Sequence, residues 1–144
     1  MRNILIICLI VLVCTSCNKD AGEGGTSIIE GQVVYFVRSY NNVTSSIDTF
    51  YYPKSGKDVY IIYSSNENDL YDDKFETDFN GKFRFEFLRK GDYTIMTYVD
   101  SFIYNSIGEE ISSYDYPLIK HVKISSNNST NYMSDFIIEK VLSE

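Results

Sequence analysis

The chain of 144 residues has no tryptophan, one histidine and three cysteines, and all three cysteines fall within its first 17 residues. Beyond Cys17 there is therefore no thiol for disulfides, catalysis or metal binding. A single histidine, His121, cannot form a histidine metal cluster, and no nucleophile and orienting group stand out as its partners in a triad. The lack of tryptophan also counts against a dedicated sugar-binding module.

Positive charge is scarce as well. The chain has 13 Lys and Arg against 20 Asp and Glu, which gives a net charge of −7. Phosphate backbones and anionic lipid headgroups repel such a chain, so we expect no nucleic acid partner and no electrostatic attachment to membranes. No pair of acidic residues stands out as an acid and base set. We therefore expect a protein that is not an enzyme and that uses no cofactor.

The N-terminus has the form of a secretion signal. Arg2 precedes an apolar run over residues 4–13, which is too short to span a bilayer. Thr15 and Ser16 then precede Cys17, and these small residues before a cysteine resemble the bacterial lipoprotein box, although Cys14 stands where that pattern usually has leucine. The resemblance implies a diacylglyceryl group on Cys17. The alternative is a plain secretory signal cleaved near Ser16.

Cleavage before Cys17 would remove Arg2 and change the net charge from −7 to −8, so membrane attachment would have to come from the lipid. The charged stretch of residues 18–20 resembles a surface-export signal of some lipoproteins. We expect a location in the cell envelope, anchored at the outer membrane. The predicted organisation is a signal peptide over residues 1–16, the acylated cysteine with a glycine-rich flexible linker over 17–27, and one domain over 28–144.

Residues 77–95 carry the clearest structural pattern. Phe83, Phe85 and Phe87 alternate with charged residues, which predicts a strand whose phenylalanine face is buried. Turn-forming residues lie at 78–81 before this strand and at 89–92 after it, ahead of a second apolar strand. We therefore expect these two strands to form a hairpin at the centre of the fold.

The rest of the domain also favours strands, and no stretch has the spacing of an amphipathic helix. The sequence predicts an all-β fold, a Greek-key β-sandwich of seven or slightly more strands. Two insertions, residues 39–57 and 100–116, separate these strands, and residues 48–52 could add an edge strand. The expected strands are residues 28–38, 59–63, 74–77, 82–87, 93–98, 118–124 and 133–142.

Several of these segments share a pattern with a known superfamily: Gly31 with Val33, the T-D-x-x-G-x-F-x-F motif of residues 77–85, and L-x-x-G-x-Y-x-I at residues 88–95. They resemble the carboxypeptidase regulatory-like, or transthyretin-like, β-sandwich domains. The resemblance implies a module that accompanies enzymes, nutrient transporters or adhesins. It does not choose among these functions.

Asp78 and Asn80 offer carboxylate and amide oxygens of the kind that calcium prefers, and further aspartates lie in the loop over residues 66–73. They lack the later ligands of an EF-hand loop. The alternative, which we favour, is a turn that needs residues tolerant of positive φ.

Tyrosine is concentrated in the two insertions. Its large apolar face and polar tip suit stacking on glycans or contact with proteins. Alternatively, these rings complete the core or belong to extra edge strands. We expect a lipid-anchored module that binds a polysaccharide or an envelope protein, or else a structural accessory of an adhesive or nutrient-uptake assembly. The candidate binding residues are Tyr51, Tyr52, Tyr104, Tyr114 and Tyr116.

Overall fold

A computed structural model describes residues 21–107 and 109–139, which form nine strands and no helix. The prediction of an all-β fold is thereby confirmed. Two strands beyond the seven expected ones are β2, within the first insertion, and β8, in an expected loop. The strands are β1 (Glu23–Asn41), β2 (Ser46–Pro53), β3 (Asp58–Ile62), β4 (Asp73–Glu76), β5 (Lys82–Leu88), β6 (Gly91–Tyr104), β7 (Glu110–Ile124), β8 (Thr130–Tyr132) and β9 (Phe136–Glu139).

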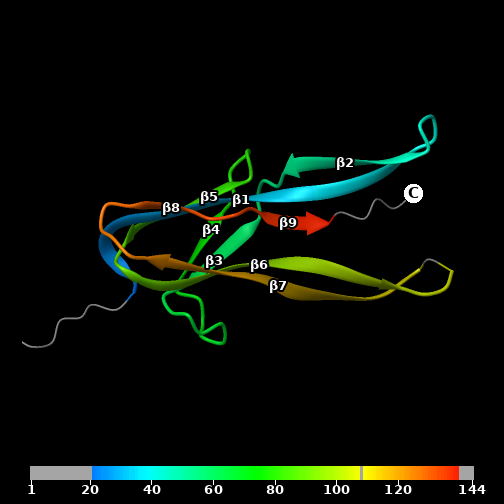
Figure 1. Ribbon diagram of the computed structural model, residues 1–144. Coiled ribbons are helices and arrows are strands. Elements are labelled where there is room, and N and C mark those ends of the chain that lie inside the picture. The colour runs from blue at the N-terminus through cyan, green and yellow to red at the C-terminus, as the bar shows by residue number, and fades with distance from the viewer. Residues whose placement is uncertain (1–20, 108, 140–144) are drawn as a thin grey trace, which may run out of the picture.

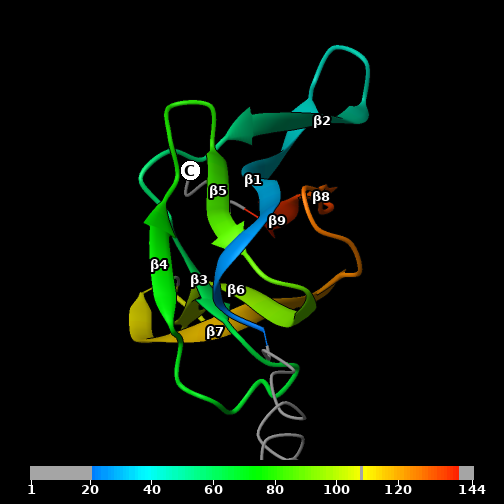
Figure 2. The ribbon, with the colours of Figure 1, turned by 90° about the vertical axis from the view of Figure 1, so that its left-hand side faces the viewer.

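The strands make two sheets that face each other, as in a β-sandwich (Figures 1 and 2). One sheet has the order β2-β1-β5, and β8 and β9 both pair in parallel with β1. The other has the order β4-β3-β6-β7, all antiparallel. The long strand β1 therefore organises its whole sheet, because each other strand of that sheet pairs with it.

The core fills the space between the sheets, as the alternating pattern predicted. Phe83 and Phe85 from one sheet meet Phe75 and Ile95 from the other, and the rings of Phe75 and Phe85 lie edge to face at 6.3 Å. Burial of these apolar faces is the main stabilising term for such a fold. The core cluster comprises Ile29, Val33, Val59, Ile61, Phe83, Phe85, Leu88, Tyr93, Ile95, Val99, Ile124, Phe136 and Ile138.

The alternation fails at Phe87, which was expected on the core face. Its side chain is 68% exposed, and its φ of 58° is positive. The pairing with β1 shifts by one residue between Phe85 and Leu88, which marks a β-bulge. The extra residue turns Phe87 outward and places Leu88 in the core, where it is 1% exposed.

The hairpin expected over residues 77–95 is also wrong. Its two strands exist, but β5 pairs with β1 whereas β6 pairs with β3 and β7. The turn between Leu88 and Gly91 therefore crosses from one sheet to the other. Alternating burial identifies the buried face of a strand, but both members of such a pair can bury their faces equally well from opposite sheets.

The linker expected over residues 17–27 is wrong from Gly22 onward. Gly22 is buried, and its N–H donates to the Tyr93 hydroxyl at 2.9 Å, while that hydroxyl donates to the Arg89 carbonyl at 2.8 Å. Residues from Glu23 belong to β1 and pair with the end of β5. A Cβ on Gly25 would lie 2.0 Å from the Leu88 carbonyl oxygen. The glycines here permit close approach of two backbones and do not provide flexibility.

The contact between Gly22 and Tyr93 predicts that the folded protein is less stable at alkaline pH. Burial raises the pKa of Tyr93, and burial together with the charge of Glu23 raises the pKa of Tyr63, whose ring packs against Tyr93 at 5.9 Å. An unfolded tyrosine titrates near pH 10, so the folded state holds these phenols protonated where the unfolded state loses its protons. Their contribution is fully present below about pH 10 and is lost as the pH rises through the folded pKa values.

We therefore expect the melting temperature to fall as the pH rises above about 10, together with the appearance of tyrosinate absorbance. Tyr63→Phe should weaken this dependence, because the variant lacks one of the phenols whose pKa is raised. Equal slopes for the variant and the original chain would contradict the assignment to Tyr63.

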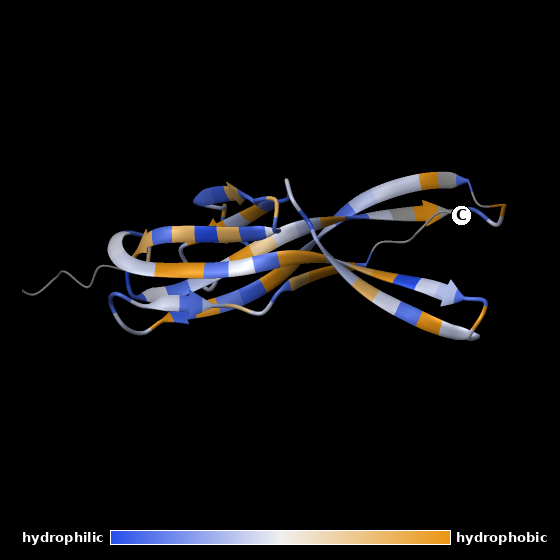
Figure 3. Ribbon diagram, turned by 90° about the horizontal axis from the view of Figure 1, so that it is seen from above, coloured by the Kyte–Doolittle hydropathy of each residue, from blue (hydrophilic) through white to orange (hydrophobic). Residues whose placement is uncertain are grey.

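Two long hairpins extend beyond the core at the same end of the molecule (Figure 1). One is formed by β1 and β2, paired from Val34 with Pro53 to Asn41 with Ser46. The other is formed by β6 and β7 and continues to Tyr104 opposite Glu110. Seen from above, the two hairpins cross (Figure 3). The insertions predicted between strands are thus mostly strand themselves, so the alternative of extra edge strands is correct in this respect.

Side chains of asparagine close both hairpin ends. The Asn41 Oδ1 accepts the N–H groups of Val43 and Thr44, and the Asn105 Oδ1 accepts those of Ile107 and Glu109. Such bonds are a standard reason for asparagine in turns. The last strand, expected over residues 133–142, is observed as β9 up to Glu139, and its residues 140–142 lie outside the described part of the chain.

Candidate functional site

The β1–β2 hairpin carries aromatic side chains on both of its faces. Tyr52 lies opposite Tyr35 and Phe50 opposite Val37, and Tyr35 and Val37 face the core side of the sheet. Phe50 and Tyr52 therefore lie on the inner face, where their rings stack at 6.4 Å. Tyr51 lies on the outer face against Phe36, at 5.4 Å between ring centres.

The β6–β7 hairpin places Tyr114 and Tyr116 on its inner face as well. Tyr116 lies opposite the buried Val99, and Tyr114 lies opposite Ser101, so both point to the core side of their sheet. Their ring centres are 6.4 Å apart. The inner faces of both hairpins therefore each present a pair of neighbouring aromatic rings.

These rings are exposed and do not complete the core. Tyr51 is 58%, Tyr52 52%, Tyr114 52% and Tyr116 41% exposed. The side chain of Tyr104 lies outside what the structure describes, although its backbone closes the ladder of the second hairpin. The four described candidates thus lie on two hairpins that project from the same end of the molecule. Their exposed rings are available for contact with another molecule.

Sequence reasoning missed the aliphatic residues near the hairpin ends. Val43 is 94% and Ile107 76% exposed, and Ile47 and Ile111 are exposed on the adjoining strands. Branched aliphatic side chains in turns are a signal that could have been noticed, because turns usually carry small polar residues. We call these four residues, together with Phe50, Tyr51, Tyr52, Tyr114 and Tyr116, the hairpin surface.

The two hairpins differ in charge. Arg38 on the first pairs with Glu139 at 3.6 Å and also lies over the Phe36 ring. On the second, Asp100 lies directly opposite Asp115, and the described residues form no ion pair with either. The second hairpin is therefore acidic without compensation.

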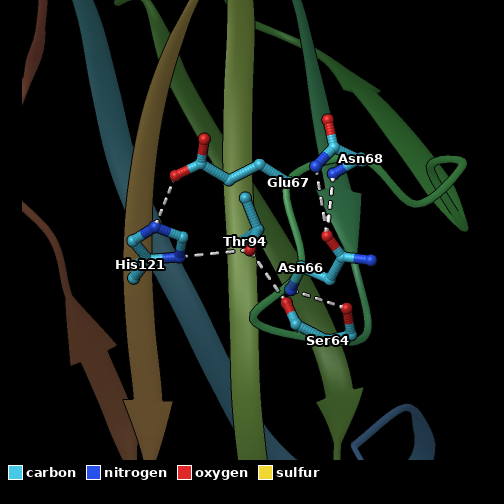
Figure 4. Close-up of polar contacts among 6 residues, drawn as sticks. All are labelled: Ser64, Asn66, Glu67, Asn68, Thr94 and His121. Carbon is cyan, nitrogen blue, oxygen red and sulfur yellow. Dashed lines mark hydrogen bonds and ion pairs between the residues drawn. The ribbon is translucent and has the colours of Figure 1, made fainter.

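The single histidine holds a loop. His121 Nε2 lies 2.9 Å from the Glu67 carboxylate, and its Nδ1 lies 3.2 Å from the Thr94 hydroxyl (Figure 4). Thr94 donates its proton to the Ser64 carbonyl at 2.8 Å, and the Ser64 hydroxyl donates to Asp69. The contacts fasten the acidic loop after β3 to β6 and β7, which agrees with the structural or exposed role expected for this histidine.

Asp78, one of the two calcium candidates, serves the turn before β5. Its Oδ1 accepts the N–H groups of Asn80 and Lys82, both at 2.8 Å. The Asn80 carbonyl accepts a bond from Gln32. Over the described residues, no group of three or more His, Cys, Asp and Glu side chains is placed to hold a metal ion. The geometry of these residues is that of the turn predicted as the alternative.

A pocket of about 480 Å³ lies beside β1 and β5, with Gly31, Phe83 and Met133 among its lining residues. Its charged lining residue Arg84 is bonded to both Glu30 and Glu86. The lining also carries Lys82, Asp78 and Asp135, which form no ion pair among the described residues. In the described part of the chain there is also no helix of the length and hydropathy needed to cross a membrane.

No protein-family model matches this chain, and no curated protein matches it. Among solved structures two chains match. One is the crystal structure of a "putative carbohydrate binding protein" from Pseudomonas aeruginosa, with 14% sequence identity and a TM-score of 0.47, covering 83% of this chain and 92% of that chain. The function of this chain therefore has to be argued from its own residues.

Proposed function

We propose that this protein is a lipid-anchored binding module of the cell envelope that holds a partner protein through its hairpin surface. The observation that carries the proposal is the exposure of Tyr51, Tyr52, Tyr114 and Tyr116 on two projecting hairpins. Tyr52, Tyr114 and Tyr116 lie on the inner faces of the hairpins and Tyr51 on an outer face, and exposed tyrosines concentrated on such projections are typical of protein interfaces. A monomer gains nothing in stability from exposing them.

A protein partner fits this surface better than a polysaccharide. Val43, Ile47, Ile107 and Ile111 extend the tyrosine surface with branched aliphatic side chains. Aromatic rings can stack on the faces of sugars, whereas aliphatic side chains are most useful against other apolar protein groups. The chain also lacks tryptophan.

The proposal also includes a lipid anchor at Cys17 and a particular type of β-sandwich. The apolar run of residues 4–13 and the small residues before Cys17 support secretion and acylation, with placement at the outer membrane. The described chain starts at the end of the molecule opposite the hairpin ends (Figure 1), so an anchor near residue 17 leaves the hairpin surface facing away from the membrane. The motifs of residues 77–95, which flank the crossing between the sheets, support a transthyretin-like Greek-key type.

Chemical cross-linking on intact cells followed by capture of the protein tests this function. We expect the double variants Tyr51→Ala/Tyr52→Ala and Tyr114→Ala/Tyr116→Ala each to reduce partner capture by about tenfold or more, as loss of aromatic anchors does at other interfaces. The matched control is Tyr132→Ala, which removes a ring that is 79% exposed but lies on β8.

A glycan array with the same proteins separates the ligand classes. Tyrosine-dependent glycan binding with unchanged protein capture would replace the protein partner by a polysaccharide. Unchanged capture and no glycan binding for either double variant would leave a structural accessory with no ligand of its own.

In the same cells, Cys17→Ser should move the protein from the membrane to the soluble fraction.

A further inference from the structure

Among the described strands, none pairs with the outer edge of β7. In the sheet order β4-β3-β6-β7, β7 comes last, and within the described residues it pairs only with β6, through every one of its positions except Ile111. Pro117 lies inside this continuous ladder, opposite Tyr98. Because proline has no N–H, its nitrogen must face the free side. With a period of two, the backbone groups of Ser113 and Asp115 face the free side as well, and these two residues have N–H groups to donate.

Only half of this edge is protected against another strand. The half next to the core carries Lys120 and Lys123 together with Pro117, and lysine and proline are the usual means of blocking an edge. Between Ile111 and Tyr116 the edge has neither. Long exposed edges without such protection readily pair with an added strand.

Charge and side-chain direction describe the strand that would fit. An added strand would have the rings of Tyr114 and Tyr116 beside its inner face, and Asp115 beside its outer face. Asp115 also lies directly opposite Asp100, which places two carboxylates side by side without a cation. Residues 98–119 contain four acidic residues and no Lys or Arg. The complementary strand therefore alternates apolar residues with Lys or Arg.

A second copy of this chain fits poorly. Pairing two β7 edges would bring their acidic residues together, in proteins that each carry a net charge of −7. Like charges on adjacent strands are destabilising. The occupant is therefore a different polypeptide.

We propose that β7 receives an extended basic segment of the partner protein as an added strand between Ile111 and Tyr116. This deepens the proposed function, on which it rests, by naming the mode of binding and the chemistry of the partner. Main-chain bonds to Ser113 and Asp115 would hold the strand, and the alternation of apolar and basic side chains would fix its register.

The test uses the secreted chain and a short synthetic peptide that alternates lysine and valine. Titration calorimetry should show binding that weakens by about tenfold when alternate peptide nitrogens are methylated, since methylation removes edge hydrogen bonds but keeps every charge. A peptide alternating glutamate and valine should not bind. Amide hydrogen exchange should show new protection at Ser113 and Asp115 with the lysine peptide.

Two matched variants locate the site. Ser113→Pro removes the free N–H and should weaken binding by about tenfold, whereas Ser113→Ala keeps it and should bind as the original chain does. Asp100→Asn with Asp115→Asn should also weaken binding while preserving shape. Equal binding of the methylated and plain peptides, or no protection at Ser113, would overturn strand addition. If the tyrosine variants still lose the cellular partner in that event, the proposed function stands without this inference.

Discussion

Gly81→Ala should lower the free energy of unfolding by about 3–5 kcal/mol, because it combines backbone strain with a clash that the fold cannot easily relieve. Gly81 has a φ of 71°, and an added Cβ would lie 2.4 Å from the Val33 carbonyl oxygen and 2.9 Å from the Lys54 nitrogen. These two atoms are themselves hydrogen-bonded at 2.9 Å. The methyl group would therefore push apart a bond that ties the end of β2 to β1.

Gly56→Ala is the matched control for strain alone. Its φ of 66° is similar, but its nearest neighbour is a flexible Glu76 side chain at 3.8 Å. Its cost should be about 1 kcal/mol, the usual penalty for a left-handed residue. Urea unfolding followed by circular dichroism measures both. Equal costs for the two variants would show that the Gly81 environment relaxes and that the clash contributes nothing.

Phe136→Ala should cost a similar amount, about 3–5 kcal/mol, by leaving a cavity in the core. Phe136 is fully buried, packs on Phe83 at 6.1 Å and lies beneath the Lys120 ammonium at 5.3 Å. It also fixes β9, a strand of four residues that pairs only with β1 among the described strands. The variant should therefore release the C-terminal strand before the rest of the fold unfolds.

Ile137→Ala is the control for this substitution. Ile137 follows Phe136 in the same strand but points outward and is 52% exposed, so its cost should stay below about 1 kcal/mol. Amide exchange of Tyr35 and Ile138, which lie opposite each other in the parallel ladder, should accelerate in Phe136→Ala alone. Unchanged exchange at these positions would mean that β9 is held by its backbone and not by the Phe136 ring.

The fold class was predictable because alternation is a local property. Phe83, Phe85, Tyr93 and Ile95 are buried where the period of two placed them. The partners of these strands were not predictable, because a strand's pattern identifies its buried face and not its neighbour. Whether the turn after Leu88 closes a hairpin or crosses between sheets depends on β1 and β3, which are distant in sequence.

The predictions for Phe87 and for the glycines of residues 22–25 were wrong for the same reason. Phe87 fits the alternation perfectly, yet a bulge set by the register of β1 against β5 turns it outward. The glycines of residues 22–25 have the composition of a linker, yet Gly25 is required by the nearby Leu88 carbonyl. In both cases a contact between segments about 60 residues apart overrides the local preference.

The tyrosines of the candidate site were predictable as a group, because they are concentrated in two segments that the core pattern left unused. The exposure of their rings was not predictable, since a tyrosine in an insertion can equally pack against its own domain. The uncompensated pair of Asp100 and Asp115 was invisible for a different reason. These residues are 15 positions apart, and only the register of β6 against β7 brings them face to face.

The contact of Gly22 with Tyr93 limits the distance between the membrane anchor and the hairpin surface. With Cys17 acylated, as proposed, four residues, 18–21, separate the lipid from this fixed point, so the body has little slack at the membrane. The 19 residues of β1, at about 3.3 Å each, then extend at most roughly 60 Å toward the hairpin ends, and the irregular pairing between Glu23 and Ile29 shortens this reach. The domain would thus act as a stiff spacer. Its hairpin surface would not contact partner proteins that lie closer to the bilayer than this height.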